Sequence, residues 1–133
     1  FERAEEIVVA HGADCASVVF LGDYLDCYER PGLEALRATL VWLRASLRDP
    51  RRTHLLCNHD LAYLFCSPDT YCSGWDEARQ GALLDELGDD LKWMRERMPL
   101  SVQAGSWVLS HAGFGPQCRD ANVDQLRAWA AHA

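Results

Sequence analysis

The stretch that decides the fold is Val18-Val19-Phe20-Leu21-Gly22-Asp23-Tyr24-Leu25-Asp26. Its first four residues are apolar and two of them are β-branched, which is typical of a buried strand. The strand leads directly into two acids, Asp23 and Asp26. A carboxylate at the carboxyl end of a buried strand lies at the edge of an α/β sheet where ligands bind. Taken alone, Gly22-Asp23 is equally typical of an ordinary turn.

Length and composition indicate one globular domain over residues 1–133. Of the 133 residues, 49% are hydrophobic and 25% are charged. The net charge of −7 argues against a nucleic-acid-binding surface and against binding to an anionic membrane. No apolar run is long enough to span a bilayer. The six cysteines contain no Cys-x-x-Cys pair and no zinc-finger spacing, so we expect reduced thiols and a cytoplasmic location.

The hydrophobic periodicity predicts alternating helices and strands. Helices are expected over residues 2–11, 33–47, 60–65 and 122–132, and in a longer stretch that ends at Pro99 and has Gly88 as a candidate break. Strands are expected over residues 18–21 and 53–57, followed later by a hairpin over residues 100–110. The longer helical stretch is expected to bury one stripe: Leu84, Leu87, Leu91, Met94 and Met98.

Three predicted strands end in polar residues that suit a divalent metal ion. These segments are Asp23-x-x-Asp26, Asn58-His59-Asp60 and His111-Ala112-Gly113. Carboxylate oxygen, amide oxygen and imidazole nitrogen are ligands for hard to borderline metals, and a carboxylate can bridge two ions. His59 lies beside a candidate ligand and would face the open side of such a site. Asp26 would then hold the His59 ring in one tautomer.

These segments resemble three of the five signature blocks of the calcineurin-like metallophosphoesterases. The matching blocks are Gly22-Asp23-Tyr24-Leu25-Asp26, Asn58-His59-Asp60 and Ser110-His111-Ala112-Gly113, and their order and spacing agree with the family. The similarity is greatest to the bacterial phosphoprotein-phosphatase-like branch, which includes relatives of diadenosine tetraphosphatase. The resemblance implies an α/β fold in which the strands form part of a layered β-sandwich flanked by helices.

The resemblance also implies a role for each matching residue. Asp23 would bridge two divalent ions (Mn, Fe or Zn), and Asn58 and His111 would bind the second ion. His59 would be the general acid that protonates the leaving alkoxide, oriented by Asp26. The ions would activate a water for in-line attack on a phosphorylated substrate, which would be a phosphoprotein, a small phosphoester or a dinucleoside polyphosphate.

The sequence departs from the family pattern at several points. The first block, Asp-x-His, and the last, Gly-His-x-His, are absent, and the chain opens at Phe1 inside a helical pattern, so we expect a piece of a longer protein. The arginine that usually grips phosphate is here Cys27, and Arg30 is the candidate substitute. The glycine that usually precedes Asn-His is Cys57, which is expected to crowd the backbone. We therefore expect the chain alone to bind one metal ion weakly and to hydrolyse little.

Other interpretations stay open at this point. A catalytically degenerate member that serves as a binding scaffold is favoured by the absent blocks, by Cys27 and by Cys57. A structural zinc module built on the cysteines is disfavoured by their spacing. Asp23 and Asp26 also suit a turn, Asn58 suits a helix N-cap, and His111 suits a hydrogen-bonded histidine at a strand end. Three histidines lie outside any motif and are expected to be structural: His11, His54 and His132.

Overall fold

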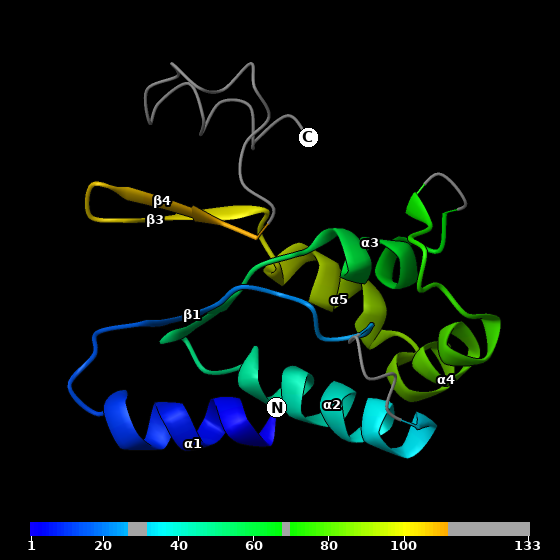
Figure 1. Ribbon diagram of the computed structural model, residues 1–133, viewed down its shortest axis with the longest axis horizontal. Coiled ribbons are helices and arrows are strands. Elements are labelled where there is room, and N and C mark those ends of the chain that lie inside the picture. Colours follow the sequence, from blue (N-terminus) through cyan, green and yellow to red (C-terminus); the bar gives the residue numbers. More distant parts are fainter. Residues whose placement is uncertain (27–31, 68–69, 112–133) are drawn as a thin grey trace.

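The computed structural model describes residues 1–26, 32–67 and 70–111. In chain order these residues form α1 (Glu2–His11), β1 (Val18–Phe20), α2 (Leu33–Ser46), β2 (Arg52–His54), α3 (Asn58–Phe65), α4 (Glu77–Leu87), α5 (Asp90–Arg97), β3 (Ser101–Ala104) and β4 (Trp107–Ser110). The predicted α/β fold is confirmed (Figure 1). The predicted helix over residues 122–132 lies outside the described residues, as do Cys27 and Arg30.

The strands form two small sheets. β1 and β2 are parallel and are connected through α2, with Val18 opposite Arg52 and Phe20 opposite His54. Because the two strands are parallel, their carboxyl ends share one edge, where the polar residues that follow them meet. β3 and β4 form a separate antiparallel hairpin, which projects away from the β1–β2 pair in Figure 1. The strands of the described part of the chain do not by themselves form a layered β-sandwich.

The second strand is shorter than the predicted residues 53–57. β2 ends at His54, and Cys57 caps a helix instead of ending a strand. The Cys57 Sγ accepts a hydrogen bond from the backbone N–H of Asp60 at 3.2 Å. Because this cap satisfies a free N–H of the first helical turn, α3 begins at Asn58, earlier than the predicted start at residue 60.

Helices α2 to α5 supply most of the apolar core. The buried leucines of α2, which are Leu36, Leu40 and Leu43, have the three- and four-residue spacing of an amphipathic helix, whereas Leu33 is exposed. The stripe predicted for the next helical stretch is wrong at Leu84, which is 44% exposed, whereas Leu83 is fully buried. Gly88, with a φ of 48°, breaks the stretch into α4 and α5. The two helices therefore have separate phases, and one continuous repeat does not describe both.

Helix α1 has the predicted bounds but buries none of its residues. It is attached through Glu5, which accepts hydrogen bonds from Arg52 (Nη2 to Oε2, 3.0 Å) and from Nε1 of Trp42 (2.6 Å). Ile7 and Val9 remain exposed. None of the helices in the described part of the chain has the length and apolar character needed to cross a membrane.

Candidate metal centre

The turn after β1 brings three segments to one point. Gly22 has a φ of 111° and Asp23 a φ of 62°, conformations that glycine adopts freely and aspartate tolerates. A Cβ atom on Gly22 would lie 2.6 Å from Cβ of Cys57 and 3.1 Å from Nδ1 of His111. Glycine is therefore required, because a larger residue would separate this turn from the start of α3 and from the end of β4.

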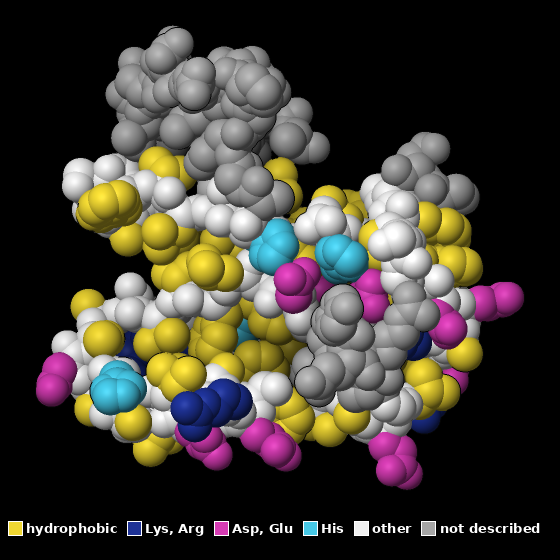
Figure 2. Space-filling view, in the orientation of Figure 1, with side chains coloured by type: hydrophobic (Ala, Val, Ile, Leu, Met, Phe, Trp, Pro, Cys, Tyr) yellow, Lys and Arg dark blue, Asp and Glu magenta, His cyan; other side chains and the backbone are white. Residues whose placement is uncertain are grey.

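Asp23, Cys57 and His111 form a compact group of candidate metal ligands. Oδ1 of Asp23 lies 3.6 Å from Nε2 of His111 and 3.1 Å from Sγ of Cys57. One candidate ligand atom from each of the three residues lies within 4.8 Å of the other two. Asp23 is exposed, His111 is partly exposed and Cys57 is buried. Figure 2 shows two histidine side chains next to acidic side chains near the middle of one face of the molecule.

The backbone sets the tautomer of His111. Its Nδ1 lies 2.7 Å from the carbonyl oxygen of Leu21, and because a carbonyl can only accept, Nδ1 is the donor. In the neutral ring, Nε2 therefore carries a lone pair and faces the Asp23 carboxylate at 3.6 Å. Two acceptor atoms that face each other in this way suit a cation between them. Anchoring of the second ring nitrogen by a carbonyl is usual for metal-binding histidines.

His59 and Asp26 form a second pair. Nδ1 of His59 lies 2.9 Å from Oδ2 of Asp26. The Asp26 residue is only 8% exposed. The Cys72 thiol donates to the same oxygen over 3.7 Å, and Asp26, His59 and Cys72 make a second group of candidate ligands. Gly74 packs directly against the carboxylate, since a Cβ atom there would lie 1.7 Å from Oδ2. The buried carboxylate holds the ring by Nδ1 and leaves Nε2 for proton exchange.

The other two predicted site residues are Asn58 and Arg30. Asn58 is the first residue of α3, and its side chain is exposed and makes no hydrogen bond with the described residues. Arg30 lies outside the described residues. The structure thus brings Asp23 to His111 and Asp26 to His59.

Asp60 holds in place the turn after β1, which contains Asp23 and Asp26. The sequence pattern did not indicate this role. The Asp60 side chain is fully buried, and Oδ1 accepts hydrogen bonds from the backbone N–H groups of Tyr24 and Leu25, both at 3.0 Å. Its Oδ2 has no hydrogen-bond partner within the described part of the chain. Burial raises the pKa of Asp60 to about 6. The available signal was an acid in the first turn of a helix that is apolar from Leu61 onward.

Cys57 is the second residue whose role the sequence analysis missed. Cys57 lies directly against the turn after β1, and the missing side chain of Gly22 leaves room for its Cβ atom. Its Sγ accepts hydrogen bonds from the N–H groups of Asp23 and Asp60, each at 3.2 Å, and donates to Oδ1 of Asp23. Burial raises the pKa of the thiol. The nearby Asp60 carboxylate and the hydrogen bond from the thiol to Asp23 raise it further. No local motif marks this residue, since its partners meet it only in the folded chain.

The donor set fits a divalent metal ion. Asp23 supplies oxygen, His111 supplies nitrogen with its free lone pair, and Cys57 lies close enough to supply sulfur. Such a mixture suits borderline first-row ions. The exposed side of the group leaves room for water or a substrate oxygen.

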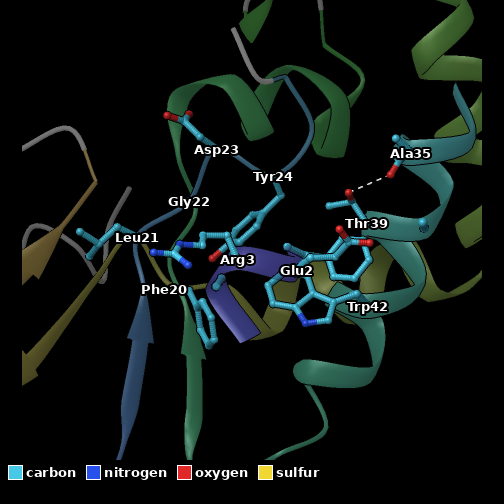
Figure 3. A pocket seen from close by; sticks show the side chains of 13 residues that line it. Glu2, Arg3, Phe20, Leu21, Gly22, Asp23, Tyr24, Ala35, Thr39 and Trp42 are labelled. Atoms are coloured by element: carbon cyan, nitrogen blue, oxygen red, sulfur yellow. Dashed lines mark hydrogen bonds between the residues drawn. The ribbon is translucent and has the colours of Figure 1, made fainter. Parts of the chain in front are cut away.

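A cavity of about 640 Å³ lies next to the turn but does not enclose these ligands. The start of α1, the turn after β1 and one face of α2 surround it (Figure 3). Aromatic side chains of Phe20, Tyr24 and Trp42 line much of it. Figure 3 shows the Asp23 carboxylate pointing away from the cavity. Asp23 is thus at the border of the cavity, whereas Cys57 and His111 do not line it.

Comparison with protein-family models, with curated proteins and with solved structures gives no significant match to the chain.

Proposed function

We propose that this chain carries part of the active site of a metal-dependent phosphoesterase, which hydrolyses phosphoric esters by attack of a metal-activated water. One observation carries the proposal: residues from the three motif blocks pair with one another. Asp23 faces His111, and Asp26 holds His59. Unrelated turn acids and strand-end histidines have no physical reason to form two such pairs.

Asp23, Asn58 and His111 would hold the metal. We infer two divalent ions in the complete domain, with manganese, iron or zinc as candidates. When bound, these ions lower the pKa of a water molecule and stabilise charge on the phosphoryl oxygens. The Leu21 carbonyl keeps Nε2 of His111 directed at Asp23, so the ligand is oriented before an ion arrives.

His59 would be the general acid. With Nδ1–H donated to Asp26, protonated His59 holds its second proton on Nε2 and transfers it to the leaving alkoxide. Asp26 acts as a positioning residue, because its buried carboxylate fixes the ring and stabilises the imidazolium. The chain then needs no covalent nucleophile.

The substrate would be a phosphoprotein, a small phosphoester or a dinucleoside polyphosphate, with Arg30 as a candidate phosphate contact. We further propose that the two small sheets belong to a layered β-sandwich flanked by helices. A cytoplasmic location is part of the proposal, since four of the described cysteines are free thiols.

The test is hydrolysis of an aryl phosphate and of diadenosine tetraphosphate, in the presence of Mn²⁺, by the natural protein that contains this sequence. We expect turnover that is lost in Asp23→Asn and His111→Ala together with bound metal. His11→Ala is the matched control, because His11 is an exposed histidine at the end of α1. Absence of turnover on both substrates by a metal-loaded protein would overturn the proposal.

A binding scaffold is the second candidate, and the Cys57 thiol favours it. The thiol donates to the Asp23 oxygen that a metal would need. If the natural protein binds neither Mn²⁺ nor Zn²⁺ but remains folded, the degenerate scaffold is the better description.

A further inference from the structure

We propose that the Cys57 thiolate is an additional protein ligand of the ion held by Asp23 and His111, so that this centre prefers Zn²⁺ and similar borderline ions to Mn²⁺. This inference rests on the metal centre of the proposed function. It adds a sulfur ligand that neither the motif blocks nor their spacing indicates.

The distances suit a shared ion. Zinc lies about 2.0 to 2.3 Å from oxygen, nitrogen and sulfur ligands, so ligand atoms around a tetrahedral ion are roughly 3.3 to 3.6 Å apart. Oδ1 of Asp23 lies 3.1 Å from Sγ of Cys57 and 3.6 Å from Nε2 of His111. Each of the three residues has a candidate ligand atom within 4.8 Å of one on each of the other two. The two distances from Oδ1 of Asp23 therefore need to change by only a few tenths of an ångström for these pairs of atoms to bind one ion.

Two backbone donors would stabilise the Cys57 thiolate once an ion is bound, whereas burial and the Asp60 carboxylate raise the pKa of the thiol in the metal-free chain. The backbone N–H groups of Asp23 and Asp60 both donate to Sγ at 3.2 Å. Hydrogen bonds of this kind stabilise metal-bound sulfur and tune its donor strength. Cys57 is only 2% exposed, so water does not compete for the sulfur. In the metal-free chain the thiol hydrogen lies between Sγ and Oδ1 of Asp23, and a cation would replace it there as the proton leaves to solvent.

The backbone fixes Cys57 from two sides. It is the N-cap of α3, and the missing side chain of Gly22 lets its Cβ atom approach the turn. Cys15, in contrast, is exposed and lies outside both groups of candidate ligands. Cys72 belongs to the other group, with Asp26 and His59. These two residues are therefore the matched controls for Cys57.

A sulfur ligand determines which ions the centre favours. Thiolates bind zinc and other borderline or soft ions well, whereas manganese and magnesium prefer oxygen ligands. We therefore expect Zn²⁺ and Co²⁺ to displace Mn²⁺ from the chain.

The test is Co²⁺ binding followed by absorption spectroscopy. We expect visible d–d bands from bound cobalt together with a near-ultraviolet thiolate-to-cobalt charge-transfer band. Cys57→Ser should keep the d–d bands, lose the charge-transfer band and bind Zn²⁺ at least ~10-fold more weakly. Cys15→Ser and Cys72→Ser should keep both bands.

The unmodified chain gives an independent measurement that does not depend on how the variant folds. X-ray absorption of the zinc-loaded chain should show one sulfur at about 2.3 Å. Bound cobalt or zinc without a sulfur ligand would overturn this inference and leave the metal centre standing. Loss of the charge-transfer band in Cys72→Ser and not in Cys57→Ser would also overturn it. Absence of any bound ion would overturn both this inference and the proposed function.

Discussion

Nδ1 of His59 donates to Oδ2 of Asp26 across 2.9 Å, a contact between residues 33 positions apart. The acid follows β1 and the histidine lies in the first turn of α3, so their meeting depends on how the two parallel strands end. Asp26 is buried while the His59 side chain is one third exposed. A buried acceptor and an accessible ring give His59 a fixed orientation and access to a substrate.

Replacing His59 with alanine should separate catalysis from metal binding. If His59 is the general acid, His59→Ala should lower kcat of the natural protein by about 10² to 10⁴-fold and leave the metal content unchanged. Metal analysis of the purified variant, together with hydrolysis of an aryl phosphate, measures both quantities. An equal loss of metal would show that His59 is a ligand and not the acid.

The meeting of Asp26 with His59 was predictable because β1 and β2 are parallel and end at one edge of a sheet, whereas His111 comes from the separate β3–β4 hairpin. The bounds of α1 and the buried repeat of Leu36, Leu40 and Leu43 followed from helical periodicity. Periodicity did not predict that Leu83 is buried in place of Leu84, because the helix break at Gly88 gives α4 and α5 separate buried faces.

The sequence pattern also did not predict the contacts of Asp60, Cys57 and Cys72. Each of these residues meets partners that are distant along the chain. Local periodicity carries information about which face of an element is buried, but not about which distant side chain it meets. Their roles therefore became visible only in the folded chain.

Gly74→Ala should disturb the His59–Asp26 pair, although Gly74 is distant from both residues along the chain. The added Cβ atom would lie 1.7 Å from Oδ2 and 2.5 Å from Cγ of Asp26, and the loop cannot easily retreat, because Tyr63 donates to the Gly74 carbonyl at 3.0 Å. We expect a loss of about 1 to 3 kcal/mol in the free energy of unfolding, measured by urea denaturation.

Gly81→Ala is the matched control for this variant. Gly81 lies inside α4 with no atom within 4 Å of the added Cβ position. Alanine there should stabilise the chain by about 0.5 to 1 kcal/mol. If Gly74→Ala is as stable as the unmodified chain, the packing of this loop against Asp26 is not what holds the carboxylate.

Asp60→Ala should destabilise the turn after β1. The substitution leaves the buried N–H groups of Tyr24 and Leu25 without their acceptor, and each unsatisfied group costs about 1 to 3 kcal/mol. We expect a total loss of about 3 kcal/mol in urea denaturation and weaker Zn²⁺ binding in calorimetry. Asp85→Ala is the control, because its side chain is 78% exposed. A loss below about 1 kcal/mol would show that the turn keeps its shape without Asp60.

His54 should make the stability of the chain depend on pH. The ring is fully buried, with Nε2 2.8 Å from Oγ of Ser46 and Nδ1 3.1 Å from the hydroxyl of Tyr24. Burial, and then the charge of Arg52, lower the pKa of His54 from 6.5 to about 4. Because the folded pKa is lowered, its stabilising contribution is complete above pH 6.5 and is lost as the pH falls towards 4.

Urea denaturation at pH 7 and at pH 5 measures this contribution. Over that interval the unfolded chain takes up a proton on His54 that the folded chain does not, which lowers the free energy of unfolding by about 2 kcal/mol. His54→Gln removes the titrating ring, so the unmodified chain should lose about 2 kcal/mol more than this variant. Equal losses in the unmodified chain and in His54→Gln would show that His54 takes up its proton without unfolding.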